Sequence, residues 1–168
     1  MSPTPSAMGL ALAALATLCW AGAAQAQNNA SATITATVQQ PITVTKNNDL
    51  SFGSVFPGVD KSIAVSAGGA AKFTVAGQTS TPVNLTFTIP ATIASGGNNL
   101  ALANWTAHHA TTDVTTGGTT FTPSASATSA TLSGSGALYV YVGATAQPTP
   151  AQASGSYSGS MTMTVVYF

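Results

Sequence analysis

The chain carries few side chains that could do acid–base chemistry. Its 168 residues include three Lys, three Asp and two His, with no Arg and no Glu. Acid–base catalysis needs several ionisable groups in one cleft, so this small supply argues against an enzyme. Turn chemistry accounts for Asp49 and Asp60. We therefore expect no catalytic residues and no cofactor.

His108, His109 and Asp113 are the one group whose types suit a metal ion. Imidazole and carboxylate groups are zinc ligands. Adjacent strand residues point to opposite faces, so the two His would share one ion only where the chain bends. We interpret them as a solvated loop pair and expect no metal site.

The charge content excludes several classes of protein. Charged residues make up 4% of the chain, and the formal net charge is zero. A nucleic-acid-binding protein needs a basic surface, so we expect no nucleic-acid partner. Disordered tails and long coiled coils are rich in charged residues, which excludes both.

Residues 1–26 have the pattern of a secretory signal peptide. An apolar run of 13 residues, 8–20, is too short to span a bilayer, and Ala24-Gln25-Ala26 has the form of a cleavage site. We expect the exported chain to begin at Gln27. Lipid attachment at Cys19 is the alternative, which Leu18 before it disfavours.

The segment that follows, residues 27–40, alternates apolar and hydroxyl side chains and then meets Pro41. Ala32, Ile34, Ala36 and Val38 would share one face of an extended strand. Pro removes a ladder donor and interrupts the pattern. We predict an N-terminal strand here, followed by one domain over 41–168.

The rest of the chain keeps the period of two, with turn residues every 8–12 positions. The ranges we predict as strands are 42–46, 50–56, 62–66, 72–76, 82–89, 100–106, 119–122, 138–142 and the C-terminal segment. Gly68-Gly69 predicts a hairpin between 62–66 and 72–76. Many short strands and no convincing helix predict an all-β antiparallel sandwich.

The C-terminal segment resembles the closing motif of subunits assembled by the chaperone–usher pathway. The residues that carry this resemblance are Gly155, Tyr167 in the penultimate place, and the alternating Met161, Met163 and Val165. PITVTKNNDLSFGSVFPG (41–58) and LYVYVGATAQ (138–147) are similar to a bacterial family of secreted pilin-like β-sandwich domains of unassigned function. The chain departs from many such pilins because residues 27–168 contain no cysteine.

This resemblance implies an immunoglobulin-like sandwich that lacks one strand. A donor strand from another copy then completes it, and residues 27–40 have the pattern of that donor, with Ala32, Ile34, Ala36 and Val38 as the interface. The implied partners are further subunits, a periplasmic chaperone that grips the C-terminal strand, and an outer-membrane usher. The implied product is a pilus-like filament at the bacterial surface, with no stable membrane insertion.

Two other interpretations remain open. The N-terminal strand could be the first strand of a complete sandwich that binds a surface ligand such as a glycan, with Trp105 as a carbohydrate platform rather than a core residue. The C-terminal alternation could instead end a small outer-membrane barrel, although the face with Thr162 and Thr164 is polar for a lipid contact.

Overall fold

The computed structural model describes residues 28–168. The expected signal peptide, Cys19 and the cleavage site therefore lie outside the described residues. Residues 28–168 form ten strands, and across them no helix is long and apolar enough to cross a membrane. The strands are β1 (Thr43–Asn48), β2 (Lys61–Ile63), β3 (Ala71–Ala76), β4 (Pro82–Thr88), β5 (Thr92–Ser95), β6 (Asn98–Ala110), β7 (Thr119–Phe121), β8 (Thr128–Thr131), β9 (Ala137–Gln147) and β10 (Thr162–Tyr167).

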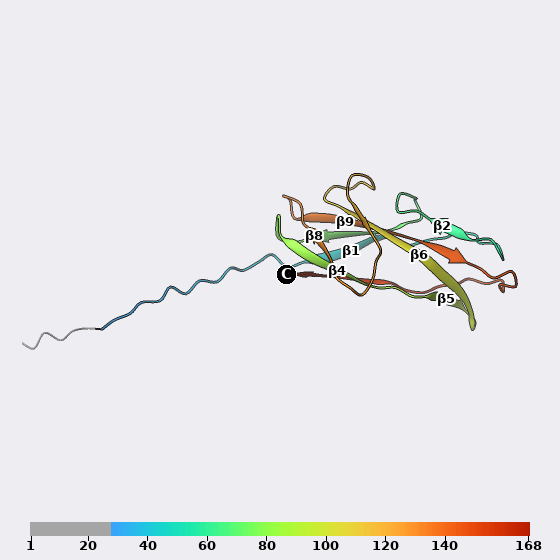
Figure 1. The fold of residues 1–168 in the computed structure, drawn as a ribbon, viewed down its shortest axis with the longest axis horizontal. Helices are drawn as coiled ribbons and strands as arrows, with labels where there is room; N and C mark the ends of the chain where they lie inside the picture. Colours follow the sequence, from blue (N-terminus) through green and yellow to red (C-terminus); the bar gives the residue numbers. More distant parts are fainter. Residues whose placement is uncertain (1–27) are drawn as a thin grey trace, which may run out of the picture. The chain divides into compact units, whose positions relative to one another are not determined.

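The strands form two antiparallel sheets (Figure 1). The larger sheet has seven strands in the order β1-β3-β9-β6-β5, with β2 also pairing with β9 and β7 with β6. The smaller sheet has three strands in the order β10-β4-β8. This arrangement confirms the prediction of an all-β antiparallel sandwich.

The core lies between the sheets and follows the alternation in the sequence. In β4 the buried side chains are Val83, Leu85 and Phe87, and in β10 they are Met163 and Val165. These side chains join those of β3 and β9 in one apolar cluster. Each fully buried aliphatic or aromatic side chain contributes about 1.5–3 kcal/mol to folding, so this alternation fixes which face of each strand turns inward.

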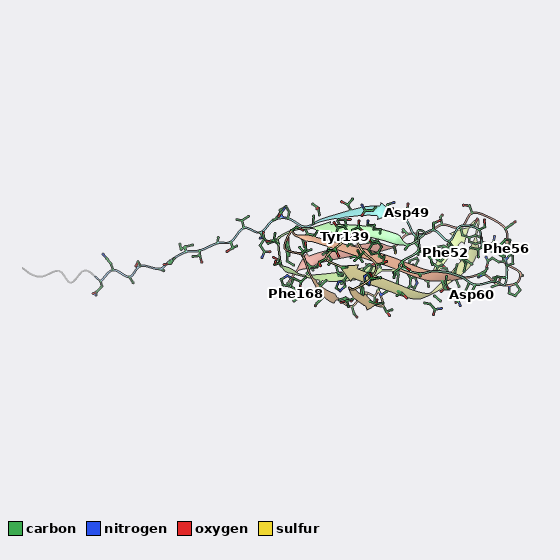
Figure 2. All side chains as sticks on the ribbon, turned by 90° about the horizontal axis from the view of Figure 1, so that it is seen from above. Asp49, Phe52, Phe56, Asp60, Tyr139 and Phe168 are labelled. Atoms are coloured by element: carbon green, nitrogen blue, oxygen red, sulfur yellow. The ribbon has the colours of Figure 1, made fainter. Side chains whose placement is uncertain are left out.

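The strands run between two ends of the body, which we call the first pole and the second pole. The 11 residues of β9 start at the first pole with Ala137 and reach the second pole at Gln147, a span of about 36 Å at the usual rise per residue. Gln147 donates a hydrogen bond to Asp60 at the second pole. Figure 2 shows Phe168 at the first pole and Phe56 at the second.

Two of the predicted strand assignments are wrong. Residues 50–56 form no strand, and the one hydrogen bond that their amides donate to described backbone runs from Ser51 to the Gly69 carbonyl. The predicted hairpin around Gly68-Gly69 is also wrong, because β2 pairs with β9 and not with β3. Leu50 and Phe52 begin an alternation that breaks at Ser54-Val55, and no neighbouring strand lies where these residues could form a ladder.

Other elements were missed or shortened in the prediction. β5 and β8 were not predicted, and β6 and β9 are longer than expected. Gly96 and Gly97, which both have positive φ, link β5 to β6. Residues 28–41 form no strand within the chain, although we predicted one from 30 to 38.

Candidate functional site: an uncovered seam between the two sheets

One side of the sandwich has two uncovered edges. Within residues 28–168, β1 pairs only with β3, and β10 pairs only with β4. Val44 is paired with Val75 and Lys46 with Phe73, and both of these partners are buried. Paired residues point to the same face of a sheet, so Val44 and Lys46 face the core side. Val44 is nevertheless 41% exposed, which shows that the described residues leave the inner face of β1 partly uncovered.

The two edges border a gap that we call the seam. Residues 48–55, which end and follow β1, form one wall, and residues 153–161, which precede β10, form the other. Between these walls the seam widens into a groove of about 990 Å³. The floor of the groove is mainly apolar and consists of Phe52, Phe73, Leu100, Leu102, Trp105 and Met161.

Both walls present unpaired backbone to the groove. No amide of residues 52–56 donates to another backbone group among the described residues, and the Ser51 amide is the last in this wall to do so. In the opposite wall, Ser158 exchanges two backbone hydrogen bonds with Ala94 of β5, and no other amide of residues 153–161 donates to described backbone. Serine and glycine predominate in the walls, so small side chains leave the backbone accessible. An apolar floor between unpaired backbone edges is the arrangement that accepts an added β-strand.

Two glycines allow the second wall to lie against β5. A Cβ at Gly155 would come within 2.6 Å of the Ser95 hydroxyl, and one at Gly159 within 2.7 Å of the Ile93 side chain. Real Cβ atoms do not make such contacts, so a larger residue would push the wall away. Gly155, which we singled out from the sequence, therefore has a packing role inside the chain.

The seam is closed at the first pole by the hydroxyl of Tyr167. This hydroxyl donates to the Gln40 carbonyl at 2.7 Å and accepts from the Gln78 amide at 2.6 Å. The Gln40 amide in turn donates to the Gln78 side chain. A Cβ at Gly77 would lie 2.5 Å from the hydroxyl, so glycine is needed there. The first pole is thus tied shut, whereas the groove-lining residues Val55, Pro57 and Pro148 lie toward the second pole, where we place the mouth of the groove.

One ion pair lines the groove in the described part of the chain. Lys46 and Asp49 lie 2.6 Å apart, and their side chains are 56% and 77% exposed. An exposed pair of this kind contributes little to stability. The two charges compensate each other, so the groove has no net charge from its side chains.

The N-terminal segment has the alternation of a strand but no strand partner among residues 28–168. Ile34 is 96% exposed and Val38 is 94% exposed, and Ala32 and Ala36 are exposed as well. Four apolar side chains at a spacing of two would share one face of an extended chain. Four exposed apolar side chains along one face are unusual in a chain with so few charged residues.

The C-terminal strand has the orientation that its sequence predicts. Met163 and Val165 are buried, and Met161 and Tyr167 pack against the core from its rim. β10 therefore turns the alternating apolar face inward, while its free backbone edge borders the seam. All the residues that we singled out in the C-terminal segment lie on or beside the seam.

The two His were interpreted wrongly as a solvated loop pair. Both lie in β6, His108 is 3% exposed, and neither Nε2 atom has a hydrogen-bond partner among the described residues. Burial, and to a lesser extent the neighbouring His108, lowers the pKa of His109. No group of three or more metal-ligand side chains occurs between residues 28 and 168.

Asp113 belongs to a separate cluster on the outer face of the larger sheet. It accepts hydrogen bonds from Lys72, at 2.7 Å, and from the Tyr141 hydroxyl. Lys72 also lies 5.7 Å from the ring centres of Tyr139 and Tyr141. These bonds hold the loop between β6 and β7 on the sheet. The hydrogen bond from Lys72, followed by that from Tyr141, lowers the pKa of Asp113.

The floor of the groove is the part that sequence reasoning missed. Trp105 packs against both apolar clusters, as the core interpretation expected, yet it also lines the groove. Leu100 and Leu102 join it from the same strand. The alternation of Leu100 and Leu102 was visible in the sequence. Which side of the sandwich stays uncovered depends on which strands lie at the sheet edges, and alternation does not show this.

Residues 42–167 match the model of a family described as a domain of unknown function, DUF4402. No curated protein matches the chain.

Proposed function

The chain belongs to the DUF4402 family, which carries no assigned function, and we propose that it is the structural subunit of a bacterial surface filament resembling a pilus or fimbria. In this proposal residues 27–38 of one copy enter the groove of the next copy as an added strand. Ala32, Ile34, Ala36 and Val38 then face the apolar floor. The protein is exported, and its role is structural rather than catalytic.

The observation that carries this proposal is the groove with its unpaired backbone walls. Strand addition gains main-chain hydrogen bonds from such an edge and specificity from alternate side chains. The chain offers both halves of the contact, an open groove and an exposed alternating segment. The segment from 28 to 38 is as long as β9, which runs from pole to pole.

The closed end of the seam sets the direction of the added strand. Tyr167 ties the first pole, so the segment enters from the second pole, with Val38 at the open mouth and Ala32 deeper. The added strand then runs antiparallel to β10, which heads toward the first pole. Antiparallel pairs are slightly more stable per residue than parallel ones, which favours pairing with β10 over pairing with β1, to which the added strand runs parallel.

Head-to-tail donation of this kind produces a polymer. The donating segment and the accepting groove are different surfaces, so the contact is heterologous and continues from copy to copy unless it closes into a ring. Before assembly, the open edge of β10 would need protection. A periplasmic chaperone that pairs with this edge and an outer-membrane usher that hands the subunit on are the partners we propose.

One observation favours a second candidate function. Trp105 and Tyr157 both line the groove, beside Gln152 and several Ser residues. Aromatic faces beside polar groups suit a sugar ring. A secreted sandwich that binds a glycan in this groove is therefore the alternative.

A peptide of residues 27–40 tests the proposal. The acceptor is the chain with Ile34→Asp, which keeps its whole body but carries a charge on its own donor face. We expect the peptide to raise the free energy of unfolding by about 2.7 kcal/mol at a concentration near a hundred times its Kd. The control is the same peptide with Ile34→Asp, which should not stabilise. Stabilisation by oligosaccharides but not by the peptide would favour the glycan-binding function instead.

A further inference from the structure

The second pole carries an exposed apolar pair that the proposed strand exchange does not use. Phe56 is 68% exposed and Val59 is 58% exposed, and we call these two residues the apolar tip. Figure 2 shows Phe56 at this end of the body, away from Phe168. Large apolar side chains clustered in this way mark interaction surfaces.

The backbone holds the apolar tip in a fixed place. The Val59 amide donates to the Phe56 carbonyl at 3.1 Å, which closes a turn through Pro57 and Gly58. The Gly58 amide donates to the carbonyls of Pro148 and Thr149, and its φ of +72° suits glycine. The tip is therefore fixed to the loop after β9.

The apolar tip borders the open mouth of the groove. Val55 and Pro57 line the groove, and Phe56 lies between them in the chain. Any segment that enters at the second pole passes this mouth. The body of the subunit that donates the segment must then come close to the apolar tip.

The short stretch between the donated segment and the donor's own body sets how close the two subunits come. In the proposed exchange Val38 of the donor sits at the mouth, and Gln40 of the same donor is fixed to its own first pole by Tyr167. The few residues from Val38 to Pro41 span at most about 10 Å. The two bodies must therefore touch.

We propose that the apolar tip of each subunit packs against the first pole of the subunit that donates to it. The occupant is a second copy of this chain. Its first pole offers an apolar surface of its own, because Phe168 is 65% exposed and Val166 is 50% exposed. This inference rests on the proposed function, since it requires the donor to enter from the second pole. It adds a body-to-body contact to the strand exchange.

Thiol labelling measures whether the apolar tip is buried in the assembly. Residues 28–168 contain no cysteine, so Phe56→Cys supplies a single reactive thiol in that part of the chain. We expect this thiol to react with a maleimide at least about tenfold more slowly in multimers than in monomers with Ile34→Asp, because only an accessible thiolate reacts. The matched control is Val114→Cys, at a site 42% exposed in the loop between β6 and β7, which should react equally fast in both forms.

A second variant, Phe56→Asp, tests the energetic contribution of the tip. The side chain does not line the groove, so the chain should bind the peptide of residues 27–40 as the unchanged chain does. Its multimers should dissociate about tenfold faster, as expected for the loss of one buried aromatic contact.

The outcomes separate this inference from the proposed function. The tip contact alone is overturned if the thiol of the Phe56→Cys variant reacts as fast in multimers as in monomers. It is also overturned if Phe56→Asp leaves the dissociation rate of the multimers unchanged. Either result leaves the tip free for another partner. A chain that neither multimerises nor binds the peptide overturns both proposals.

Discussion

Tyr141 shows how one side chain can hold a loop on a sheet in a chain with so few charges. Its hydroxyl donates to Asp113, which also accepts from Lys72. Burial, together with the hydrogen bond to Asp113 and its charge, raises the pKa of Tyr141 from 10.0 to about 12. The neutral hydroxyl is therefore the form that the folded state favours.

This shift gives a prediction for alkaline pH. Because the folded pKa lies above the unfolded one, the contribution of Tyr141 to stability is complete below pH 10.0 and is lost as the pH rises through about 12. Tyrosinate absorbance should show a component that appears only as the pH approaches about 12, and Tyr141→Phe should remove this late component. The same late component in the Tyr141→Phe chain would contradict the assignment.

Tyr167→Phe tests the closure at the first pole. The change removes the hydroxyl that bonds Gln40 and Gln78, and leaves their backbone groups without this partner. We expect the free energy of unfolding to fall by about 1 kcal/mol in a denaturant titration. The control is Tyr139→Phe, since the Tyr139 hydroxyl makes no hydrogen bond with any described residue. Equal stabilities for the two variants would show that the closure contributes nothing.

At the scale of elements, the N-terminal segment should follow strand register. Ile34 belongs to the apolar face and Thr35 to the opposite face. Ile34→Asp should abolish multimers because it places an unpaired charge against the apolar floor, which costs several kcal/mol. Thr35→Asp should change assembly free energy by less than about 0.5 kcal/mol. Multimers are counted by gel and electron microscopy, and similar behaviour of the two variants would exclude the segment as a donor strand.

Sequence reasoning succeeded where alternation alone decides the structure. β4 and β10 have strict apolar alternation, and the structure buries Val83, Leu85, Met163 and Val165 as expected. A side chain in such a strand has two possible faces, and burial selects one of them. The fold class followed from many such segments between turn residues.

Sequence reasoning failed where pairing depends on distant residues. Leu50 and Phe52 begin an alternation like that of β4, yet it breaks at Val55, and residues 50–55 form part of a groove wall because no strand lies beside them. β2 has three residues and pairs with β9, more than 80 positions away, instead of its neighbour. The His pair was placed in a loop because the surrounding Thr, Ser and Ala residues hid the length of β6. The groove could not be predicted from local patterns either, because it depends on which strands form the edges of the two sheets.

At the scale of the whole molecule, the scarcity of charge limits what can drive assembly. The formal net charge is zero, and residues 28–38 contain no charged side chain. The described groove is lined by one exposed ion pair, Lys46 with Asp49, which is already compensated. Apolar burial and main-chain hydrogen bonds must therefore provide the affinity.

This composition predicts that strand addition is nearly insensitive to salt. Long-range steering needs opposite charges on the two partners, and neither the segment nor the groove has an excess of charge. Between low ionic strength and ionic strengths where the Debye length is only about 3 Å, the Kd of the 27–40 peptide should change by less than about twofold. Binding should instead show a negative heat-capacity change, because apolar surface leaves water. Calorimetry at two salt concentrations and several temperatures measures both quantities. A Kd that rises about tenfold with salt would contradict this prediction and would mean that charge contributes to the binding.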